Sequence, residues 1–250
     1  MQESIEISKY HKLHRYIPFD WNMGSKIYKD GKYLIKLPMF SDDEEKQSKA
    51  MQELENVLLY IEDTKVKGLV EVTNLFKDKD KTIGYRLVKY DDFKSLHKFK
   101  SRWISLKIID CKRIMNLFST FNDYNLIYHD FHPGNILFNS KTNELLVCDL
   151  DSFEISDDEK NKKDQLENAL SLCVQYIYNM NPKDAFLLLT RGTVRIDENN
   201  CFKEILKTIG TKDFKESINK FDNFDKRYIL QDKFRMHDEI LDFMRTGYYH

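Results

Sequence analysis

The sequence predicts an α+β fold in which a small β-rich part is followed by a larger helical part. Its 250 residues are long for one compact domain and suit two. Within residues 23–37, two β-prone runs flank Asp30-Gly31, a pair that favours a hairpin turn. Residues 103–122 form a strongly apolar run with the character of a helix. A hairpin near the start and a long apolar helix further on together favour this division of the chain.

The first part is expected to form an antiparallel sheet with one helix. The helix, over residues 42–62, follows Ser41 and two acidic residues, which are favourable at a helix N-terminus. Three- and four-residue steps separate its apolar residues, which predicts an amphipathic helix: Met51, Leu54, Leu58 and Ile61. Two further strands are expected at 69–76 and 82–90, and an earlier strand near 9–18 is a further candidate.

The remainder of the chain is expected to be mainly helical, so we place the domain boundary between residues 1–90 and 91–250. Residues 127–139 and 144–155 interrupt the helical pattern with short extended stretches. From about residue 160 the pattern is helical again, and the last 70 residues carry no further functional signal.

Charge and cysteine usage exclude several classes of protein. Lys and Arg number 40 and Asp and Glu number 41, so neither nucleic acid nor an anionic membrane is expected as a partner. The four cysteines form no CxxC pair, and three of them lie in apolar runs, which is typical of reduced core thiols and favours the cytoplasm. No apolar segment resembles a secretory signal or reaches the length of a membrane-spanning helix, so neither is expected.

Polar residues that could carry chemistry gather in "IYHDFHPGNILFN", residues 127–139. A Pro-Gly pair lies between Asp130 and Asn135, which predicts a tight loop that can turn both side chains toward the same space. Asp149 follows the apolar "LLVC" further along, and an acid at the end of a buried strand is costly unless it binds something. Carboxylate and amide oxygens are the ligands that Mg²⁺ prefers.

This pattern of Asp-x-x-x-x-Asn followed by hydrophobic-x-Asp resembles the catalytic loop and metal-binding motif of the protein kinase superfamily. The catalytic loop would be residues 128–135 and the metal motif residues 149–151. The resemblance implies a two-lobed protein kinase-like fold that uses ATP and Mg²⁺. It also implies that Asp130 orients the acceptor hydroxyl and accepts its proton, while Asn135 and Asp149 hold the metal.

The same resemblance requires a lysine on a strand after a hairpin and a glutamate on a helix. Lys36 ends "YLIK", which is similar to the family's Val-Ala-Ile-Lys, and it would contact the α and β phosphates. Glu55 lies nearer the edge of the apolar stripe of helix 42–62 and is chosen as the partner of Lys36, with Glu53 as a close alternative. Lys36 and Glu55 therefore join Asp130 as expected catalytic residues.

Four further residues are expected at the nucleotide. Gly24 and Ser25 correspond to the loop that covers the phosphates, although the family's Gly-x-Gly-x-x-Gly is otherwise absent. Lys89 and Tyr90 lie in "LVKYD", at the position where the family's hinge meets adenine through backbone groups.

Two features of the sequence point to different acceptors and leave the acceptor open. His132 stands where most Ser/Thr kinases have Lys, and "DxHPGN" is more similar to aminoglycoside, choline and lipopolysaccharide-sugar phosphotransferases and to atypical bacterial kinases. The spacing of about 40 residues from the hinge to Asp130 is instead similar to that of compact protein kinases. His132 could reach the transferred phosphate or only brace the loop. Asp151, where the family has Gly, could assist the metal or face solvent.

We therefore expect a kinase that transfers the γ-phosphate of ATP to a hydroxyl, with a slight preference for a protein Ser/Thr acceptor over a small molecule. A pseudokinase, which is a binding module that keeps the fold without transferring phosphate, is the alternative from a different class. The degenerate loop at Gly24 favours this alternative, and the retention of Asp130, Asn135 and Asp149 opposes it.

Overall fold

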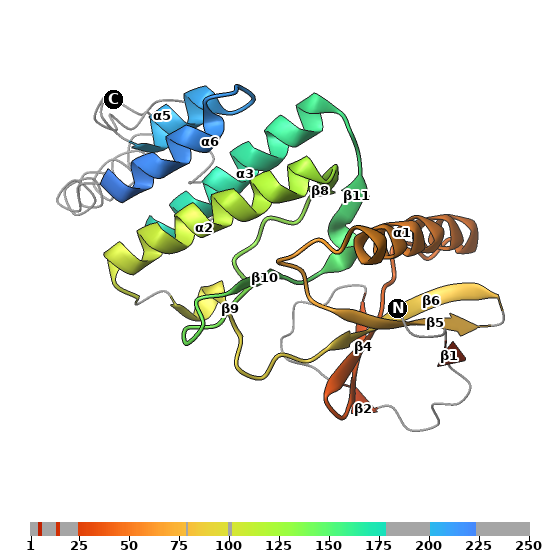
Figure 1. Ribbon diagram of the computed structural model, residues 1–250. Coiled ribbons are helices and arrows are strands. Elements are labelled where there is room, and N and C mark those ends of the chain that lie inside the picture. Colours follow the sequence, from red (N-terminus) through yellow and green to blue (C-terminus); the bar gives the residue numbers. More distant parts are fainter. Residues whose placement is uncertain are drawn as a thin grey trace, which may run out of the picture. The chain divides into compact units, whose positions relative to one another are not determined.

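The protein has a mixed α/β fold with a small sheet in its N-terminal part and helices after it (Figure 1). The computed structural model describes residues 5–6, 14–15, 25–78, 80–99, 102–178 and 201–223. Contacts divide them into two units. The first takes the described residues up to Lys94 together with Leu137–Ile155, and the second takes Ser95–Ile136 and the described residues from Ser156 onward. The boundary expected between residues 90 and 91 assigns residues 137–155 to the second part, whereas contacts group them with the first unit.

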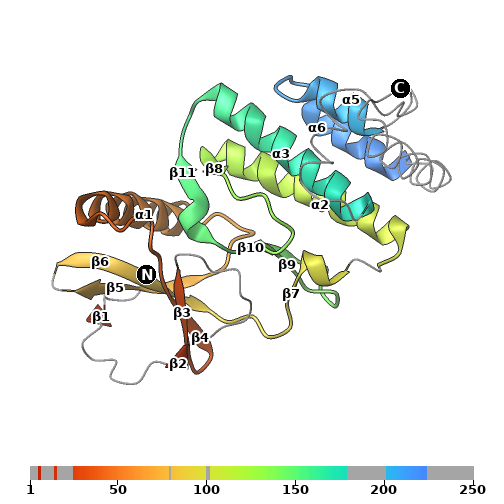
Figure 2. The same cartoon turned by 180° about the vertical axis from the view of Figure 1, so that it is seen from behind.

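The first unit is built on a six-stranded sheet in the order β1-β5-β6-β4-β3-β2 (Figure 2). The strands are β1 (Ile5–Glu6), β2 (His14–Arg15), β3 (Lys26–Asp30), β4 (Tyr33–Leu37), β5 (Val72–Asp78) and β6 (Lys81–Val88). Neighbouring strands run antiparallel except for β1 and β5, which are parallel. The expected antiparallel sheet is therefore confirmed, and its strands from β3 to β6 lie within a few residues of the expected positions.

The hairpin that was expected around Asp30-Gly31 joins β3 to β4, and Gly31 adopts a φ of 60° at its turn. A left-handed residue at this position is what a tight hairpin requires, and glycine adopts it without steric cost. On its other side β4 pairs with β6, so that Lys36 lies directly opposite Tyr85. Side chains opposite each other in an antiparallel pair project from the same face of the sheet, so this register places Lys36 and Tyr85 together.

The helix of the first unit is α1 (Glu44–Thr64), two residues later than the sequence predicted. The Asp43 side chain caps it by accepting hydrogen bonds from the amides of Glu45 and Lys46 at 3.0 and 3.1 Å. The helix ends at Lys65, which adopts the left-handed conformation. Buried residues on one side form its apolar stripe and pack toward β6 and a later strand, β11 (Phe153–Ile155): Met51, Leu54, Val57 and Leu58.

A later segment of the chain completes the first unit. It consists of β9 (Ile136–Phe138), β10 (Leu145–Val147), a 3₁₀ turn at Leu150–Ser152 and β11 (Phe153–Ile155). Val147 is held on both sides, because its amide donates to the carbonyl of Gly68 at 2.8 Å and its carbonyl accepts from the amide of Val70 at 3.1 Å. These bonds tie the segment around Asp149 to a part of the chain almost 80 residues earlier.

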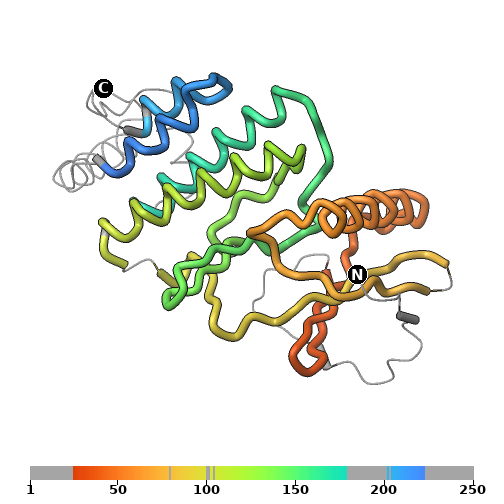
Figure 3. Tube along the Cα trace, viewed as in Figure 1, coloured from red at the N-terminus to blue at the C-terminus, as the bar shows by residue number. Residues whose placement is uncertain are grey.

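The second unit is mainly helical, as expected. Its elements are α2 (Ile104–Asp123), β8 (Leu126–Tyr128), α3 (Glu159–Tyr178), α5 (Cys201–Thr208) and α6 (Phe214–Ser217), with 3₁₀ turns at Leu96–Phe99 and Ile218–Asn223; the short strand β7 (Lys94–Ser95) lies at the division between the units. Helices α2 and α3 pack side by side (Figure 3). Fully buried residues fill this core: Ile114, Met115, Phe118, Phe121, Leu170, Leu172 and Val174.

Gln165 of α3 links this helical core to β8. Its side chain accepts a hydrogen bond from the amide of Tyr128 at 2.5 Å and donates to the carbonyl of Leu126 at 3.0 Å. It therefore anchors the strand that leads into the loop after Tyr128. The part of the expected helical pattern that falls after residue 223 lies outside the described residues. No helix of the described ranges is both long and apolar enough to cross a membrane.

A substitution at Gly84 of β6 tests the pairing of β4 with β6. A methyl group there would collide with the backbone carbonyl of Lys36 and would lie 2.5 Å from Cδ2 of Leu37. We expect Gly84→Ala to lower the free energy of unfolding by about 2–3 kcal/mol, as overpacking of a buried site does. Gly31→Asn is the control, because that turn is open and Asn tolerates its conformation. Urea denaturation of both variants measures the difference, and equal stability would contradict the tight packing of β4 on β6.

Candidate functional site

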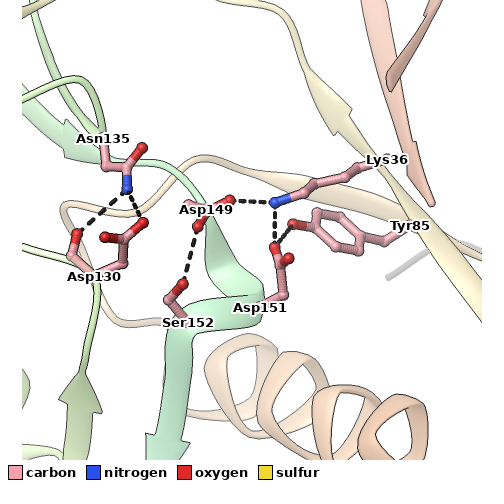
Figure 4. Close-up of polar contacts among 7 residues, drawn as sticks. All are labelled: Lys36, Tyr85, Asp130, Asn135, Asp149, Asp151 and Ser152. Carbon is pink, nitrogen blue, oxygen red and sulfur yellow. Dashed lines mark hydrogen bonds and ion pairs between the residues drawn. The ribbon is translucent and has the colours of Figure 1, made fainter. Parts of the chain in front are cut away.

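The functional site expected from the sequence contains a buried lysine with two carboxylates. Lys36 lies in the middle of the sheet on β4, and its side chain is only 8% exposed. Its Nζ contacts Oδ1 of Asp149 and Oδ1 of Asp151 (Figure 4). An ammonium group inside a protein is costly unless negative charge lies beside it. The two carboxylates therefore explain how Lys36 is tolerated at this position.

The segment after β10 has the shape needed to present both carboxylates. Leu150 is fully buried and anchors the 3₁₀ turn between Asp149 and Asp151. Asp149 itself adopts a left-handed conformation with φ 66° and ψ 55°. This conformation costs a residue other than glycine about 1 kcal/mol, and such strain is often found at functional sites. Ser152 stabilises it, because its hydroxyl donates to Oδ2 of Asp149 at 2.9 Å and its amide to the Asp149 carbonyl at 3.0 Å.

Tyr85 holds the second carboxylate. Its side chain is fully buried, and its hydroxyl donates to Oδ1 of Asp151 at 2.8 Å. The same oxygen lies 2.5 Å from Nζ of Lys36 (Figure 4). Burial raises the pKa of Tyr85 well above its usual value, and the negative charges of Asp151 and Asp149 raise it further. The tyrosine therefore remains protonated and acts as a hydrogen-bond donor.

The charges of this cluster also determine the state of Lys36. Burial alone would lower the pKa of the ammonium group, but Asp151 and Asp149 outweigh that effect and raise the pKa above its usual value. Lys36 is therefore positively charged at any physiological pH. The cluster of Lys36, Asp149 and Asp151 contains one ammonium group and two carboxylates, so one carboxylate is in excess and can attract a further cation.

In the second unit, Asp130 and Asn135 form the tight loop that the sequence predicted. The side-chain amide of Asn135 donates to Oδ2 of Asp130 at 2.7 Å and to the Asp130 backbone carbonyl at 3.3 Å (Figure 4). Two backbone hydrogen bonds close the same loop. The N–H of His132 donates to the Asp130 carbonyl at 2.8 Å, and the N–H of Asn135 donates to the His132 carbonyl at 2.9 Å. Asp130 is exposed to solvent. The loop thus presents a carboxylate whose direction is set by an amide five residues later.

The imidazole of His132 braces this loop. Its Nδ1 accepts a hydrogen bond from the amide of Gly134 at 2.9 Å. A methyl group at Gly134 would lie 2.6 Å from the same Nδ1, so the ring occupies the space that only glycine leaves open. Of the two roles considered for His132, this geometry supports the structural one.

The ion pair expected between Lys36 and Glu55 does not form. Glu55 instead accepts a hydrogen bond from Thr82 at 2.7 Å and lies 3.4 Å from Nζ of Lys77. Lys77 and Thr82 are paired across β5 and β6, near the outer end of that hairpin. Lys36 is paired with Tyr85 further along β6, so α1 presents Glu55 to a different part of the sheet.

The alternative partner, Glu53, does not contact Lys36 either. Its side chain is 67% exposed and lies 3.9 Å from Lys49 one turn earlier on α1. An exposed ion pair of this kind contributes little to stability. Neither glutamate of the helix therefore takes the position that the resemblance implied.

The residues expected at the nucleotide are distributed as follows. Gly24 lies outside the described residues, and Ser25 is half-buried immediately before β3. The amide of Lys89 donates to the carbonyl of Lys32 at 3.0 Å, and its Nζ pairs with Asp91. This amide is therefore already used within the sheet.

Tyr90 follows directly and is fixed by two contacts. Its hydroxyl accepts a hydrogen bond from the amide of Glu71 at 3.2 Å. Its ring meets the ring of Phe93 edge-on, with 5.2 Å between centroids. The Tyr90 carbonyl accepts from the amide of Phe93 at 3.3 Å, so the chain turns tightly after β6.

The sequence assigns no definite role to two residues that lie beside Lys36, namely Asp151 and Tyr85. Asp151 was considered either as an aid to the metal or as a solvent-facing acid, but its side chain is only 10% exposed and contacts Lys36. Tyr85 was not considered at all. The one signal that could have indicated it is strand register, because Tyr85 is the residue opposite Lys36 once β4 and β6 are aligned.

The chemistry of this donor set suits a hard cation. Carboxylate oxygens of Asp149 and Asp151 are the ligand type that Mg²⁺ prefers, and it commonly takes only one or two of them and completes its shell with water and phosphate. Within the described ranges, no group of three or more His, Cys, Asp and Glu side chains is arranged to hold a metal ion. A search of protein-family models gave no match to this chain, and no curated protein is significantly similar to it.

The thiol next to Asp149 provides a test of the local environment. Burial raises the pKa of Cys148 from 9.0 to about 12, and Asp149 adds to this effect. At pH 8 the reactive thiolate is therefore about a thousandfold rarer than at an ordinary cysteine. We expect Cys148 to resist iodoacetamide in the folded protein and to react after unfolding in urea, as followed by peptide mass spectrometry. Rapid alkylation of the folded protein would contradict this environment.

Proposed function

We propose that the protein is an ATP-dependent phosphotransferase with a protein kinase-like, two-lobed fold, which transfers the γ-phosphate to a hydroxyl group. The observation that carries the proposal is the contact between Lys36 and Asp149, which are 113 residues apart in the chain. The family resemblance assigns both residues to the same nucleotide. Their meeting in a buried, charged cluster supports a shared role at the phosphates.

Lys36 would bind the α and β phosphates of ATP. Its buried, permanently charged ammonium group loses little additional hydration when it meets a phosphate, which makes it an effective anion-binding group. Asp149 is more exposed than the other two members of the cluster, at 26%, so its carboxylate can reach a ligand. It would bind the Mg²⁺ ion that neutralises the phosphates.

The family resemblance assigns the remaining roles to the loop from Asp130 to Asn135. Asp130 is exposed, and Asn135 holds its carboxylate in one direction. Both properties suit a carboxylate that would orient an acceptor hydroxyl and take its proton. Asn135 would provide an amide oxygen for the metal, since its nitrogen already donates to Asp130. Catalysis would come mainly from positioning and charge neutralisation.

We propose a protein Ser/Thr hydroxyl as the acceptor, on the compact spacing between the hinge and Asp130. The main alternative is a small hydroxylated molecule, which the "DxHPGN" motif favours. A nucleotide-binding module without transfer is supported by the same Lys36 cluster, because that cluster would bind phosphates in either case.

Incubation with ATP and Mg²⁺ tests the reaction. We expect the wild-type protein to transfer labelled γ-phosphate, and Asp130→Ala to reduce the rate at least about a hundredfold while ATP binding persists, because general-base groups contribute that much. Asp149→Ala should abolish the dependence of ATP binding on Mg²⁺. Asp157→Ala, which removes an exposed acid outside both clusters, is the matched control and should behave as wild type.

Two results of that experiment would overturn the proposed transfer. Wild-type protein that binds ATP but transfers no more phosphate than Asp130→Ala would be a binding module. Wild-type protein that neither binds nor hydrolyses ATP would have no nucleotide function.

The acceptor is tested separately by competition between substrate classes. We expect label to appear on phosphoserine or phosphothreonine when a mixture of unfolded proteins is offered, and phosphoamino-acid analysis measures it. Parallel reactions with an aminoglycoside, choline and a sugar, analysed by mass spectrometry, cover the alternative. Transfer to one of these with none to protein would reassign the acceptor to the small-molecule class.

A further inference from the structure

We propose that Asp151, held by Tyr85, is the residue that positions Lys36 for the nucleotide phosphates. This inference rests on the proposed function and assigns the positioning role that the family resemblance had given to a glutamate on the helix. Asp151 and Tyr85 act through Lys36 and are therefore positioning residues. Lys36 is the group that would touch the nucleotide.

The geometry forms a chain of three groups on one face of the sheet. Tyr85 and Lys36 are opposite each other on β6 and β4, and both contact Oδ1 of Asp151 (Figure 4). All three side chains are shielded from water, with exposures of 0% for Tyr85, 8% for Lys36 and 10% for Asp151. A hydrogen bond from a fully buried donor restricts the rotamers of Asp151, and the carboxylate in turn restricts the long side chain of Lys36.

Asp149 cannot fill the same role while it binds a metal ion. Its Oδ2 already accepts the hydroxyl of Ser152, and its Oδ1 contacts Lys36. If that oxygen is used for Mg²⁺, the positive ion and the ammonium group compete for one acceptor. Asp151 then remains as the counter-ion of Lys36. Asp149 would therefore bind the metal ion, and Asp151 would pair with Lys36.

Helix α1 does not position Lys36, because its candidate residue, Glu55, contacts other residues. Glu55 is bound to Thr82 and lies near Lys77, at the outer end of the β5–β6 hairpin. The groups that orient Lys36 come instead from β6 and from the segment that contains the metal ligand. Glu55 of α1 therefore does not orient Lys36.

Nucleotide binding by four variants tests the assignment. For Asp151→Asn we expect ATP to bind about tenfold more weakly in the presence of Mg²⁺, because it removes the charge that contacts Lys36 directly. For Tyr85→Phe we expect about threefold, because it removes a donor that acts only through Asp151. Adenosine has no phosphates for Lys36 to contact, so its affinity should change little in either variant. A general loss of structure would instead weaken ATP and adenosine alike. Titration calorimetry measures both ligands.

Two further variants give the comparison. Tyr33→Phe removes a hydroxyl from a half-buried tyrosine of β4, the strand that carries Lys36, and should bind ATP as wild type does. Glu55→Gln should weaken ATP less than Asp151→Asn does. A larger effect of Glu55→Gln, or an equal loss of adenosine and ATP in Asp151→Asn, would overturn the inference.

A second measurement separates this inference from the proposed function. If the wild-type protein binds no ATP, the proposed function fails, and a double-mutant cycle on urea midpoints decides the positioning role alone. The cycle combines Lys36→Met with Asp151→Asn and, separately, with Glu55→Gln. Non-additive shifts for Lys36 with Asp151 and additive shifts for Lys36 with Glu55 would support the pairing, and additive shifts in both cycles would overturn it.

Discussion

A positive charge inside the first unit has to be balanced by negative charge, and this requirement organises the candidate site. The ammonium group of Lys36 lies in the middle of a sheet, where hydration cannot stabilise it. Two carboxylates from a distant segment supply the balance, and they do so only because β10 is bound to residues 68–70. The later segment thus brings Asp149, in its left-handed conformation, and Asp151 to the buried charge.

The Lys36 cluster and the loop from Asp130 to Asn135 are stabilised in different ways. The Lys36 cluster depends on contacts between residues far apart in the chain. Its charges are paired with one another because little water surrounds them. The loop from Asp130 to Asn135 depends on hydrogen bonds within six residues, with the His132 ring filling the space beside Gly134. A loop of this kind keeps its shape through local geometry, whereas the Lys36 cluster exists only when the whole first unit is folded.

Local signals were sufficient for most of the fold. The hairpin at Asp30-Gly31, helix α1, helix α2 and the strands β5 and β6 formed within a few residues of their expected positions, because turn residues, caps and apolar periodicity act over short distances. The grouping of residues 137–155 with the sheet was not predicted. It depends on the bonds of Val147 to Gly68 and Val70, which no local pattern indicates.

By itself, the sequence determined which residue types the candidate site contains and the tight loop that joins Asp130 to Asn135. Their spacing was enough, because a Pro-Gly pair leaves the chain few conformations. Only the tertiary structure decided the partner of Lys36, which is Asp151 with Asp149 rather than Glu55. The reason is strand register: it sets Tyr85 opposite Lys36 and Thr82 within reach of Glu55. Register arises from the packing of many residues and cannot be read from one helix or one motif.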